Sequence, residues 1–346
     1  MKNAVWLEKQ GYFEILKYRR PHESKGELAF ISRVLLKEFK SNGHKYRVDS
    51  AGNHIVIVGD NLEPTVMFSC HTDTVHNRMV PGLTQRLKIH NDHEVTSIQK
   101  ECLGADDATG IFLMFMLMRK QIPGLYVFHR GEERGGIGSQ HIAANWQFDN
   151  IQQAVAFDRA NDHHIITHQG GTRCASDEYA MSLAEQLNKH CGSASQKAPW
   201  QPNNGGTFTD TKNYTKLVPE CTNLSVGYYQ QHSHTEWQDL DFLVKMAKGI
   251  HKINWNKLVI ARDPLANDYD THFDLASKIT EYTRRYGDKP NIVSPDFIRQ
   301  NASAIAKWFT DEGYIEEELE EEIAYMSASS NTRTSLSPVE IQRKNL

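Results

Sequence analysis

The chain has 346 residues, enough for one large or two ordinary domains with a substantial core. Hydrophobic residues make up 39% and charged residues 24%, as in ordinary globular proteins, which excludes a disordered or fibrous chain. The 39 Lys and Arg residues against 43 Asp and Glu give a net charge of -4, so no overall positive field attracts nucleic acid. We therefore expect no nucleic-acid partner.

The sequence also lacks the features of a membrane or secreted protein. Its longest apolar run, residues 111–118, is well short of the ~20 residues that a membrane-spanning helix needs. Residues 1–10 contain charged side chains and no hydrophobic segment of the kind found in a secretory signal. The five cysteines are an odd number without a C-x-x-C pair, which argues against a disulfide framework. We expect a cytoplasmic protein with no membrane partner.

Predicted strands and helices alternate along the first 260 residues. Residues 24–39 have apolar side chains at helical spacing, with Ser24 and Glu27 placed as a capping box. The predicted strands are residues 54–58, 64–70, 125–129, 153–157 and 223–227, and the later predicted helices are the segment after Gly110 and residues 139–146, 178–189 and 240–253. This alternation predicts an α/β fold, a three-layer α/β/α sandwich with a mostly parallel mixed central sheet.

The C-terminal part of the chain differs in composition. Residues 261–270 are polar, contain a proline and resemble a linker. Beyond them, Ser294 and Pro295 mark the start of a predicted helix at 296–311, and the chain is rich in Ser, Thr and Asn from residue 327. We therefore predict a main domain at 1–260, a helical extension at 261–326 and a disordered tail at 327–346.

Side chains that bind metals follow directly on several predicted strands. Four such positions lie at the end of a predicted strand or in the loop after it: His71, the pair Glu132 and Glu133, Asp158, and His232. In a parallel α/β sheet the carboxyl ends of the strands lie along one edge, so these residues are expected to converge.

Each of these motifs also has an ordinary structural explanation. The sequence His71-Thr-Asp73 occurs in surface loops, but its spacing suits a metal-bound histidine oriented by a carboxylate. Glu132 and Glu133 fit a solvated turn, or a pair in which one residue binds metal and the other handles protons. Asp106 and its neighbour fit a helix N-cap. The motifs occurring together in this order indicate a metal centre.

The ordered set resembles the co-catalytic di-zinc exopeptidase superfamily, which includes peptidase T, the glutamyl and leucyl-type zinc aminopeptidases and carboxypeptidase G. The resemblance extends over about residues 21–243. The matching motifs are His71-Thr-Asp73, Gly104-Ala-Asp106-Asp107, Glu132-Glu133 with Gly135, Gly136 and Gly138, Ala156-Phe-Asp158, and His232-Ser-His-Thr-Glu236.

The resemblance implies a metallopeptidase of the exopeptidase type that hydrolyses a peptide or amide bond with two zinc ions. The implied metal ligands are His71, Asp106, Glu133, Asp158 and His232, with Asp106 bridging, His71 and Glu133 completing one site, and Asp158 and His232 the other, or the reverse. Glu132 would be the general base and Asp73 would orient His71. Manganese or cobalt also suits such ligands, because geometry and availability decide among divalent ions.

The chain departs from peptidase T and carboxypeptidase G in one respect. Those proteins insert a lid or dimerisation domain before the final histidine, whereas only 74 positions separate Asp158 from His232 here. The spacing is similar to that of the single-domain aminopeptidases, and the segment from Gly205 to Asp210 resembles a Gly-Gly-Thr-Asp segment of the glutamyl aminopeptidases. Asp210 and His234 are therefore candidate substrate-binding residues, and His234 is an alternative last ligand.

We expect an aminopeptidase or small-peptide exopeptidase whose partner is a small peptide or amide. One alternative is an N-acyl amino-acid amidohydrolase or carboxypeptidase with the same centre. Another is a metal-stabilised binding or scaffold protein without turnover. The sequence leaves the oligomeric state open.

Overall fold

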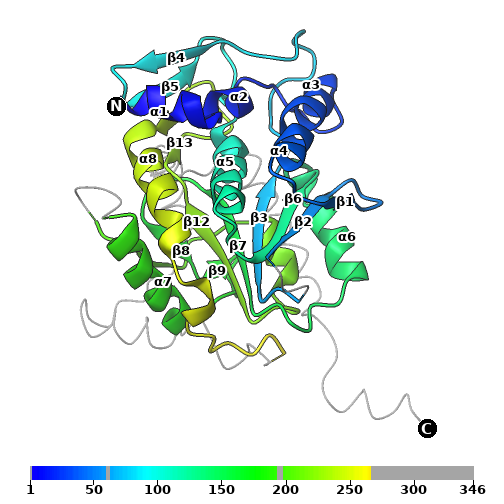
Figure 1. Cartoon of the computed structure of the whole chain (residues 1–346), viewed down its shortest axis with the longest axis vertical. Coiled ribbons are helices and arrows are strands. Elements are labelled where there is room, and N and C mark those ends of the chain that lie inside the picture. The colour runs from blue at the N-terminus through cyan, green and yellow to red at the C-terminus, as the bar shows by residue number, and fades with distance from the viewer. Residues whose placement is uncertain (1, 60–62, 193–197, 266–346) are drawn as a thin grey trace, which may run out of the picture. The chain divides into compact units, whose positions relative to one another are not determined.

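The computed structural model describes residues 2–59, 63–192 and 198–265, and its centre is a mixed sheet of eight strands (Figure 1). These residues all belong to one unit, Met1–Leu275. Of the predicted extension, residues 261–265 are described and contain no helix. The predicted helix at 296–311 and the predicted tail at 327–346 lie outside the described residues.

The strand order of the central sheet confirms the predicted α/β class. The strands, from one edge to the other, are β1 (Tyr46–Val48), β2 (His54–Val58), β6 (Gly124–His129), β3 (Val66–His71), β7 (Gln153–Arg159), β12 (Glu220–Ser225), β8 (His164–Ile166) and β11 (Gln201–Asn203). The pairs β6–β3, β3–β7, β7–β12 and β8–β11 are parallel, and the other three pairs are antiparallel. The central strands are therefore parallel and their carboxyl ends share one edge.

Helices cover both faces of this sheet, which gives the three predicted layers. On one face α5 (Ala105–Arg119) and α7 (Asp177–His190) pack against the strands, and α2 (Tyr12–Leu16) and α8 (Leu240–Gly249) pack on α5, with α1 (Asn3–Gln10) against both α2 and α8. The other face carries α6 (Ile137–Asn145) and the 3-10 helix η3 (Asp210–Tyr214). Successive side chains of a strand point to opposite faces. Accordingly, Phe68 joins the core on the α5 face, whereas Met67 joins the smaller core on the α6 face.

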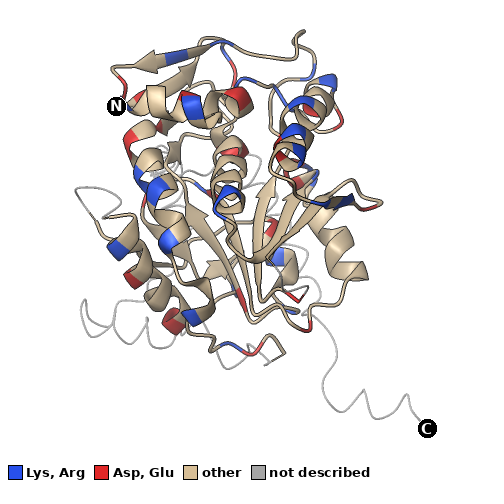
Figure 2. Ribbon diagram, viewed as in Figure 1, with Lys and Arg blue, Asp and Glu red and all other residues tan. Residues whose placement is uncertain are grey.

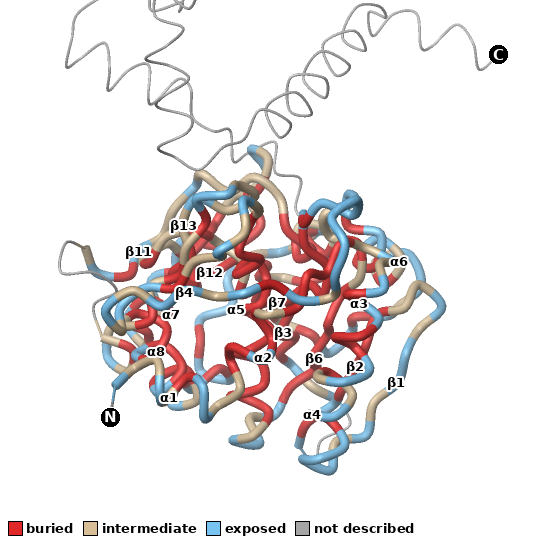
Figure 3. The backbone as a smooth tube through the Cα atoms, turned by 90° about the horizontal axis from the view of Figure 1, so that it is seen from above, coloured by how far each residue is buried: buried red, intermediate tan, exposed pale blue. Residues whose placement is uncertain are grey.

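The apolar run at residues 111–118 forms most of α5. Every side chain of this run is buried, because α5 packs on β3 and β7 with one side and on α2 with another. A helix that is hydrophobic all round belongs in a protein interior. Figure 3 shows the same pattern, with the buried residues concentrated in the central strands and in α5. Among the described residues, no helix has the length and apolar character needed to cross a membrane.

The predicted helix at 24–39 consists of three segments. These are α3 (Lys25–Phe30), the π-helix η1 (Ile31–Leu35) and α4 (Leu36–Ser41). Ser24 caps α3, since its Oγ accepts the N–H of Glu27 at 3.1 Å. Glu27 does not complete the predicted capping box. Its buried carboxylate accepts hydrogen bonds from Glu23 N–H and the Thr72 hydroxyl, and pairs with Arg130, so this helix is tied to the sheet.

A second, four-stranded sheet was not predicted. Its order is β13 (Tyr228–Tyr229), β14 (Trp237–Asp239), β5 (Glu94–Ser97) and β4 (Leu87–His90). The strands are short and partly polar, so they lack the pattern that predicts a strand. β13 and β14 pair on either side of the loop that contains His232, and the rings of Tyr229 and Trp237 stack at 4.4 Å. The second sheet thus anchors this loop.

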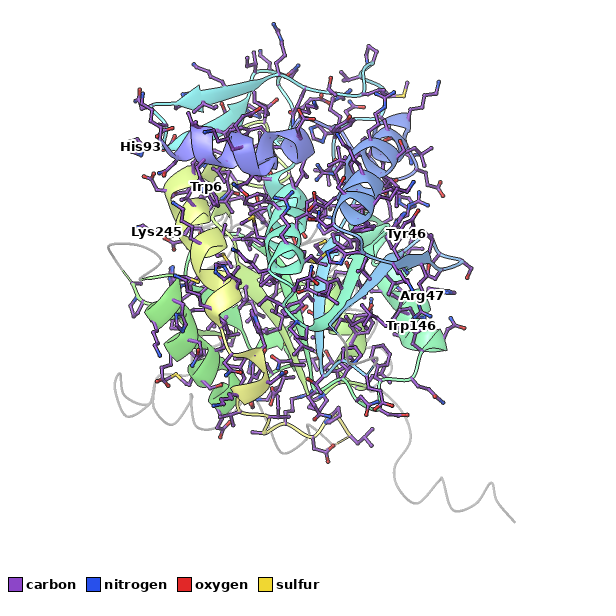
Figure 4. All side chains as sticks on the ribbon, in the orientation of Figure 1. Trp6, Tyr46, Arg47, His93, Trp146 and Lys245 are labelled. Atoms are coloured by element: carbon purple, nitrogen blue, oxygen red, sulfur yellow. The ribbon has the colours of Figure 1, made fainter. Side chains whose placement is uncertain are left out.

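Charged side chains of both signs are interspersed over the helices and outer strands (Figure 2). Some of them join neighbouring elements. The Arg47 guanidinium of β1 lies 4.3 Å from the centroid of the Trp146 ring, which follows α6, and both residues are labelled on the same side of the molecule in Figure 4. This cation–π contact fixes the edge strand β1 against α6.

Candidate active site

The ends of three adjacent parallel strands bring the predicted site residues together. His71 is the last residue of β3, which lies between β6 and β7 in the sheet and pairs with His129, the last residue of β6. Asp158 lies at the end of β7. After β6 the chain turns through Gly131 at φ +72° and enters the 3-10 helix η2 (Glu132–Arg134), which holds the two glutamates. The convergence inferred from strand ends is therefore confirmed.

Asp106 reaches the same edge from the start of α5. The backbone at Asp106 and Asp107 is not helical, and the peptide bond between them is cis. Asp107 has the capping role, because its Oδ1 accepts the N–H of Gly110 at 2.8 Å and its Oδ2 that of His71 at 3.2 Å. A side chain at Gly110 would collide with the Asp107 carboxylate and the Phe157 carbonyl, so this turn requires glycine.

The carboxylate of Asp106 lies between two histidines. Its Oδ1 is 2.9 Å from Nε2 of His71, and its Oδ2 is 3.2 Å from Nε2 of His232. The two imidazoles therefore face opposite oxygens of one carboxylate.

The other two acidic residues extend this arrangement in pairs. Oδ1 of Asp158 is 3.5 Å from Nε2 of His71, and Oε1 of Glu133 is 3.2 Å from Nε2 of His232. The resemblance implied Glu133 with His71 and Asp158 with His232. These contacts join the residues the other way, and the ligand atoms of Glu133 and His71 also lie within 4.8 Å of each other, so the grouping stays a prediction.

Among the described residues, three groups of side chains have ligand atoms close enough to hold a metal ion, and all three lie at this edge. They are His71 with Asp107 and Asp158, His71 with Glu132 and Glu133, and Asp106 with Glu133 and His232, with all ligand atoms of a group within 4.8 Å of one another. The predicted last ligand His232 belongs to one of these groups. His234 is exposed and belongs to none of them.

Asp73 interacts with this cluster in two ways. Its backbone carbonyl is 3.1 Å from Nδ1 of His71, whereas its carboxylate Oδ1 is 3.7 Å from that nitrogen. The same Oδ1 accepts the backbone N–H groups of Gly131 and Glu132 at 3.0 and 3.2 Å. The carboxylate therefore holds the turn that leads to Glu132, while the backbone carbonyl contacts the histidine ring.

Burial and crowding shift the pKa values in this cluster in opposite directions. Burial alone would lower the pKa of His71, but the Asp158 and Asp106 carboxylates raise it well above its usual value. The pKa of Glu132 is raised well above the ordinary value by removal from water, and the charges of Asp158 and Glu133 raise it further. Burial, followed by the charge of Asp106, raises the pKa of Asp158 to about 7. The carboxylates of the cluster outnumber its two histidines, so protonated imidazoles alone could not neutralise them all.

Asp158 is held by residues that sequence reasoning did not identify. Its Oδ2 accepts the Thr209 hydroxyl at 2.7 Å and its Oδ1 the Tyr228 hydroxyl at 3.1 Å, while the Asn223 side chain bonds its backbone N–H and carbonyl. Thr209 precedes the predicted substrate residue Asp210. Asp210 itself is 1% exposed and lies 3.3 Å from Nδ1 of His129. Its role towards substrate stays a prediction.

The fold and this cluster define the class: an α/β protein whose strand ends gather imidazoles and carboxylates capable of holding metal ions. The family follows from the sequence, since residues 53–284 match the model of Peptidase family M28. The chain belongs to this family. The comparison with curated proteins gives no match.

Solved structures share the fold at low sequence identity. The aminopeptidase PepT of Bacillus cereus is 16% identical with a TM-score of 0.57, and the match covers 77% of this chain and 99% of that one. The TET1 peptidase of Pyrococcus horikoshii is 16% identical with a TM-score of 0.54, covering 69% and 98%. A tripeptidase of Staphylococcus aureus is 15% identical with a TM-score of 0.52, covering 72% and 97%.

Proposed function

We propose that this member of Peptidase family M28 is a two-zinc exopeptidase that releases the N-terminal residue of small peptides, in the cytoplasm. The observation that carries the proposal is Asp106, whose two oxygens face Nε2 of His71 and Nε2 of His232. A carboxylate placed between two such nitrogens suits a ligand shared by two ions. Asp158 would join His71 as a ligand of one ion, and Glu133 would join His232 as a ligand of the other.

The residues present fit zinc. Imidazole nitrogens and carboxylate oxygens are zinc ligands, and manganese and cobalt accept the same donors. The charge balance agrees, because burial and then the charge of Asp106 raise the pKa of Asp158 to about 7, so a second negative charge is costly beside the first. Divalent cations would compensate that negative charge.

When bound, the ions would supply Lewis acidity that polarises the substrate carbonyl and makes water more acidic. Glu132 would take the proton of the attacking water on its carboxylate and deliver it to the leaving amine. Its position supports this role, since its carboxylate lies with the ligand atoms of His71 and Glu133, within 4.8 Å of one another. Asp73 would hold Glu132 in place through the backbone N–H that it accepts.

The names of the structural neighbours support the substrate class. They include an aminopeptidase and a tripeptidase, and this chain covers nearly the whole of both. We infer a substrate with a free N-terminal amine. If this is right, chromogenic amino-acid amides and tripeptides are hydrolysed, while the same tripeptides with an acetylated N-terminus are not. Hydrolysis of only the acetylated peptides would favour the alternative N-acyl amidohydrolase.

The variant Glu132→Gln tests the proposed roles. We expect turnover to be lost while the metal content, measured by elemental analysis, stays near that of the wild type. Glu133→Gln is the matched comparison, and we expect it to lower the metal content as well. A wild type that holds two metal ions but hydrolyses nothing in the panel would instead indicate a scaffold protein. Retained activity in Glu132→Gln would exclude Glu132 as the base.

A further inference from the structure

The segment Leu103 to Asp106 carries the central carboxylate of the site, and its backbone has an unusual set of partners. The carboxylate of Glu236 accepts the N–H groups of four successive residues. Oε2 accepts those of Leu103 and Gly104 at 2.9 and 3.0 Å, and Oε1 those of Ala105 and Asp106 at 2.7 and 3.2 Å. Glu236 is 2% exposed. Backbone N–H groups at a helix start lack partners within the helix, and a buried anion satisfies them.

Glu236 also links two parts of the site. It comes four residues after His232, at the end of the same loop, and it binds the backbone N–H of Asp106 itself. The His232 imidazole lies 3.2 Å from the other end of that residue, at Oδ2. The loop of His232 therefore holds Asp106 at both its backbone and its side chain.

Arg20 binds the same segment at a backbone carbonyl, whereas Glu236 binds its N–H groups. Its side chain is fully buried, and its guanidinium donates to the carbonyl oxygens of Thr72 at 2.8 Å, Ile15 at 3.2 Å and Gly104 at 3.3 Å. Thr72 follows His71 in sequence, and Gly104 lies two residues before Asp106. The guanidinium thus connects the His71 loop to the Asp106 loop.

A buried arginine that binds only carbonyl groups is costly, because burial of a charge is repaid only by good hydrogen bonds and by opposite charges nearby. Here the nearby charges belong to Asp107 and Asp73, both next to the site, and they oppose the lowering of the pKa of Arg20 by burial. The face of the Phe30 ring, 5.2 Å away, adds a cation–π contact. The planar fork of arginine suits this place because it reaches two loops at once.

We propose that Arg20 and Glu236 are positioning residues, two buried charges of opposite sign that hold the Leu103–Asp106 segment so that Asp106 stays between His71 and His232. The functional part of this inference rests on the proposed metal site. Arg20 lies between α2 and α3, before residue 53 where the family match begins, so a segment outside that match contacts the loops of His71 and Asp106. Partners that orient metal ligands typically change metal affinity 10- to 100-fold when they are replaced.

The neighbouring Arg19 offers a matched control. It is also buried, at 4% exposure, and donates to the carbonyls of Asn77 and Val80 and to Glu101. It therefore holds a different loop with a similar set of hydrogen bonds. Arg19→Met and Arg20→Met each remove one buried guanidinium. Only Arg20→Met releases the loops of His71 and Asp106.

The experiment measures zinc binding to the metal-free full-length chain by competition with a chromophoric chelator. We expect Arg20→Met and Glu236→Gln to weaken zinc binding by about 10-fold or more. Arg19→Met should change it by less than about 3-fold, because Arg19 contacts neither the His71 loop nor the Asp106 loop through its guanidinium. Arg20→Lys keeps the charge but has a single donor nitrogen in place of three, so it should recover part of the loss. It also serves if Arg20→Met does not fold. Equal weakening by the Arg19 and Arg20 variants would show a general structural role and overturn the proposal.

Amide hydrogen exchange of the metal-free chain separates this proposal from the proposed function. We expect the amides of residues 103–106 to be protected in the wild type and to exchange at least about 10-fold faster in Glu236→Gln, because two of the four N–H groups lose their acceptor. Arg19→Met should leave them unchanged. If the wild type binds no zinc but these amides respond as expected, the metal proposal fails and the positioning role stands. Unchanged protection in Glu236→Gln would refute the positioning role.

Discussion

The hydrogen bonds of Asp73 lead to a prediction that separates its two contacts. In Asp73→Ala, the N–H groups of Gly131 and Glu132 lose a charged acceptor at 3.0 and 3.2 Å, whereas the backbone carbonyl that contacts His71 remains. Each N–H left without a partner costs about 1–3 kcal/mol. The loss is offset in part because the buried carboxylate is itself costly, its pKa being raised to about 6 by burial. We expect the free energy of unfolding to fall by about 2 kcal/mol.

The effect on catalysis should be larger than the effect on stability. Releasing the turn displaces Glu132, and a displacement on the order of 1 Å can reduce the rate about 100-fold. The assay compares kcat on an amino-acid amide with the midpoint of urea denaturation. Asp73→Asn keeps an acceptor oxygen in the same place, so we expect less than a roughly 10-fold loss of kcat.

A control for this variant is Asp92→Ala. Asp92 also accepts two backbone N–H groups, those of Asn3 and Ala4, both at 2.8 Å, at the start of α1. This change should lower stability and leave kcat unchanged. The reasoning is wrong if Asp73→Ala keeps full kcat, or if Asp92→Ala loses as much. If Asp73→Asn loses as much as Asp73→Ala, the charge on Asp73 matters rather than its hydrogen bonds.

The remaining predictions concern metal, pH and packing. Removing metal with a chelator should abolish hydrolysis and lower the melting temperature. Adding zinc back at 100 times its Kd should restore about 2.7 kcal/mol to the free energy of unfolding in a denaturation assay. An unchanged melting temperature would contradict the metal site. Burial lowers the pKa of His54 to about 4, below its value in the unfolded chain. As the pH falls, the unfolded state therefore takes up the proton first, and the free energy of unfolding decreases below about pH 6.5. Between pH 8 and pH 5 the wild type should lose about 2 kcal/mol more than His54→Gln in urea denaturation, and parallel curves would refute this. Phe68 is fully buried against Tyr126, Phe157 and Trp255, so Phe68→Ala should cost about 3–5 kcal/mol in the same assay, and a loss below 1 kcal/mol would show that the core refills the cavity.

The fold class was predictable because the central strands carry a strong signal. The strand β2 was predicted with its observed bounds, and β3, β6 and β7 within two residues at each end, since all four are short runs of mostly buried apolar residues. The second sheet was not predictable in this way. β4 and β5 are half exposed and contain charged residues, and their pairing with β14 depends on residues far away in the sequence.

The site was predictable to the extent that its chemistry lies in side-chain type and strand position. His71 and Asp158 were found because each ends a buried strand, and adjacent parallel strands must bring their ends together. The pairing of individual ligands was not predictable, because it depends on side-chain directions. The family resemblance implied Glu133 with His71, whereas Oε1 of Glu133, after the turn through Gly131 and η2, lies 3.2 Å from Nε2 of His232.

The supporting residues show a more general limit. Glu132 and Glu236 are both buried or partly buried glutamates next to proposed ligands, and nothing in residue type separates them. Their hydrogen bonds do: Glu236 has both oxygens occupied by four backbone N–H groups, whereas the ligand atoms of Glu132 lie with those of His71 and Glu133. A carboxylate saturated by backbone donors has no lone pair directed at a proton in transit, so it holds the chain in place. Because every residue other than proline carries the same N–H group, a sequence cannot record such partners, and only the folded chain distinguishes the glutamate proposed to act on substrate from the one proposed to hold Asp106.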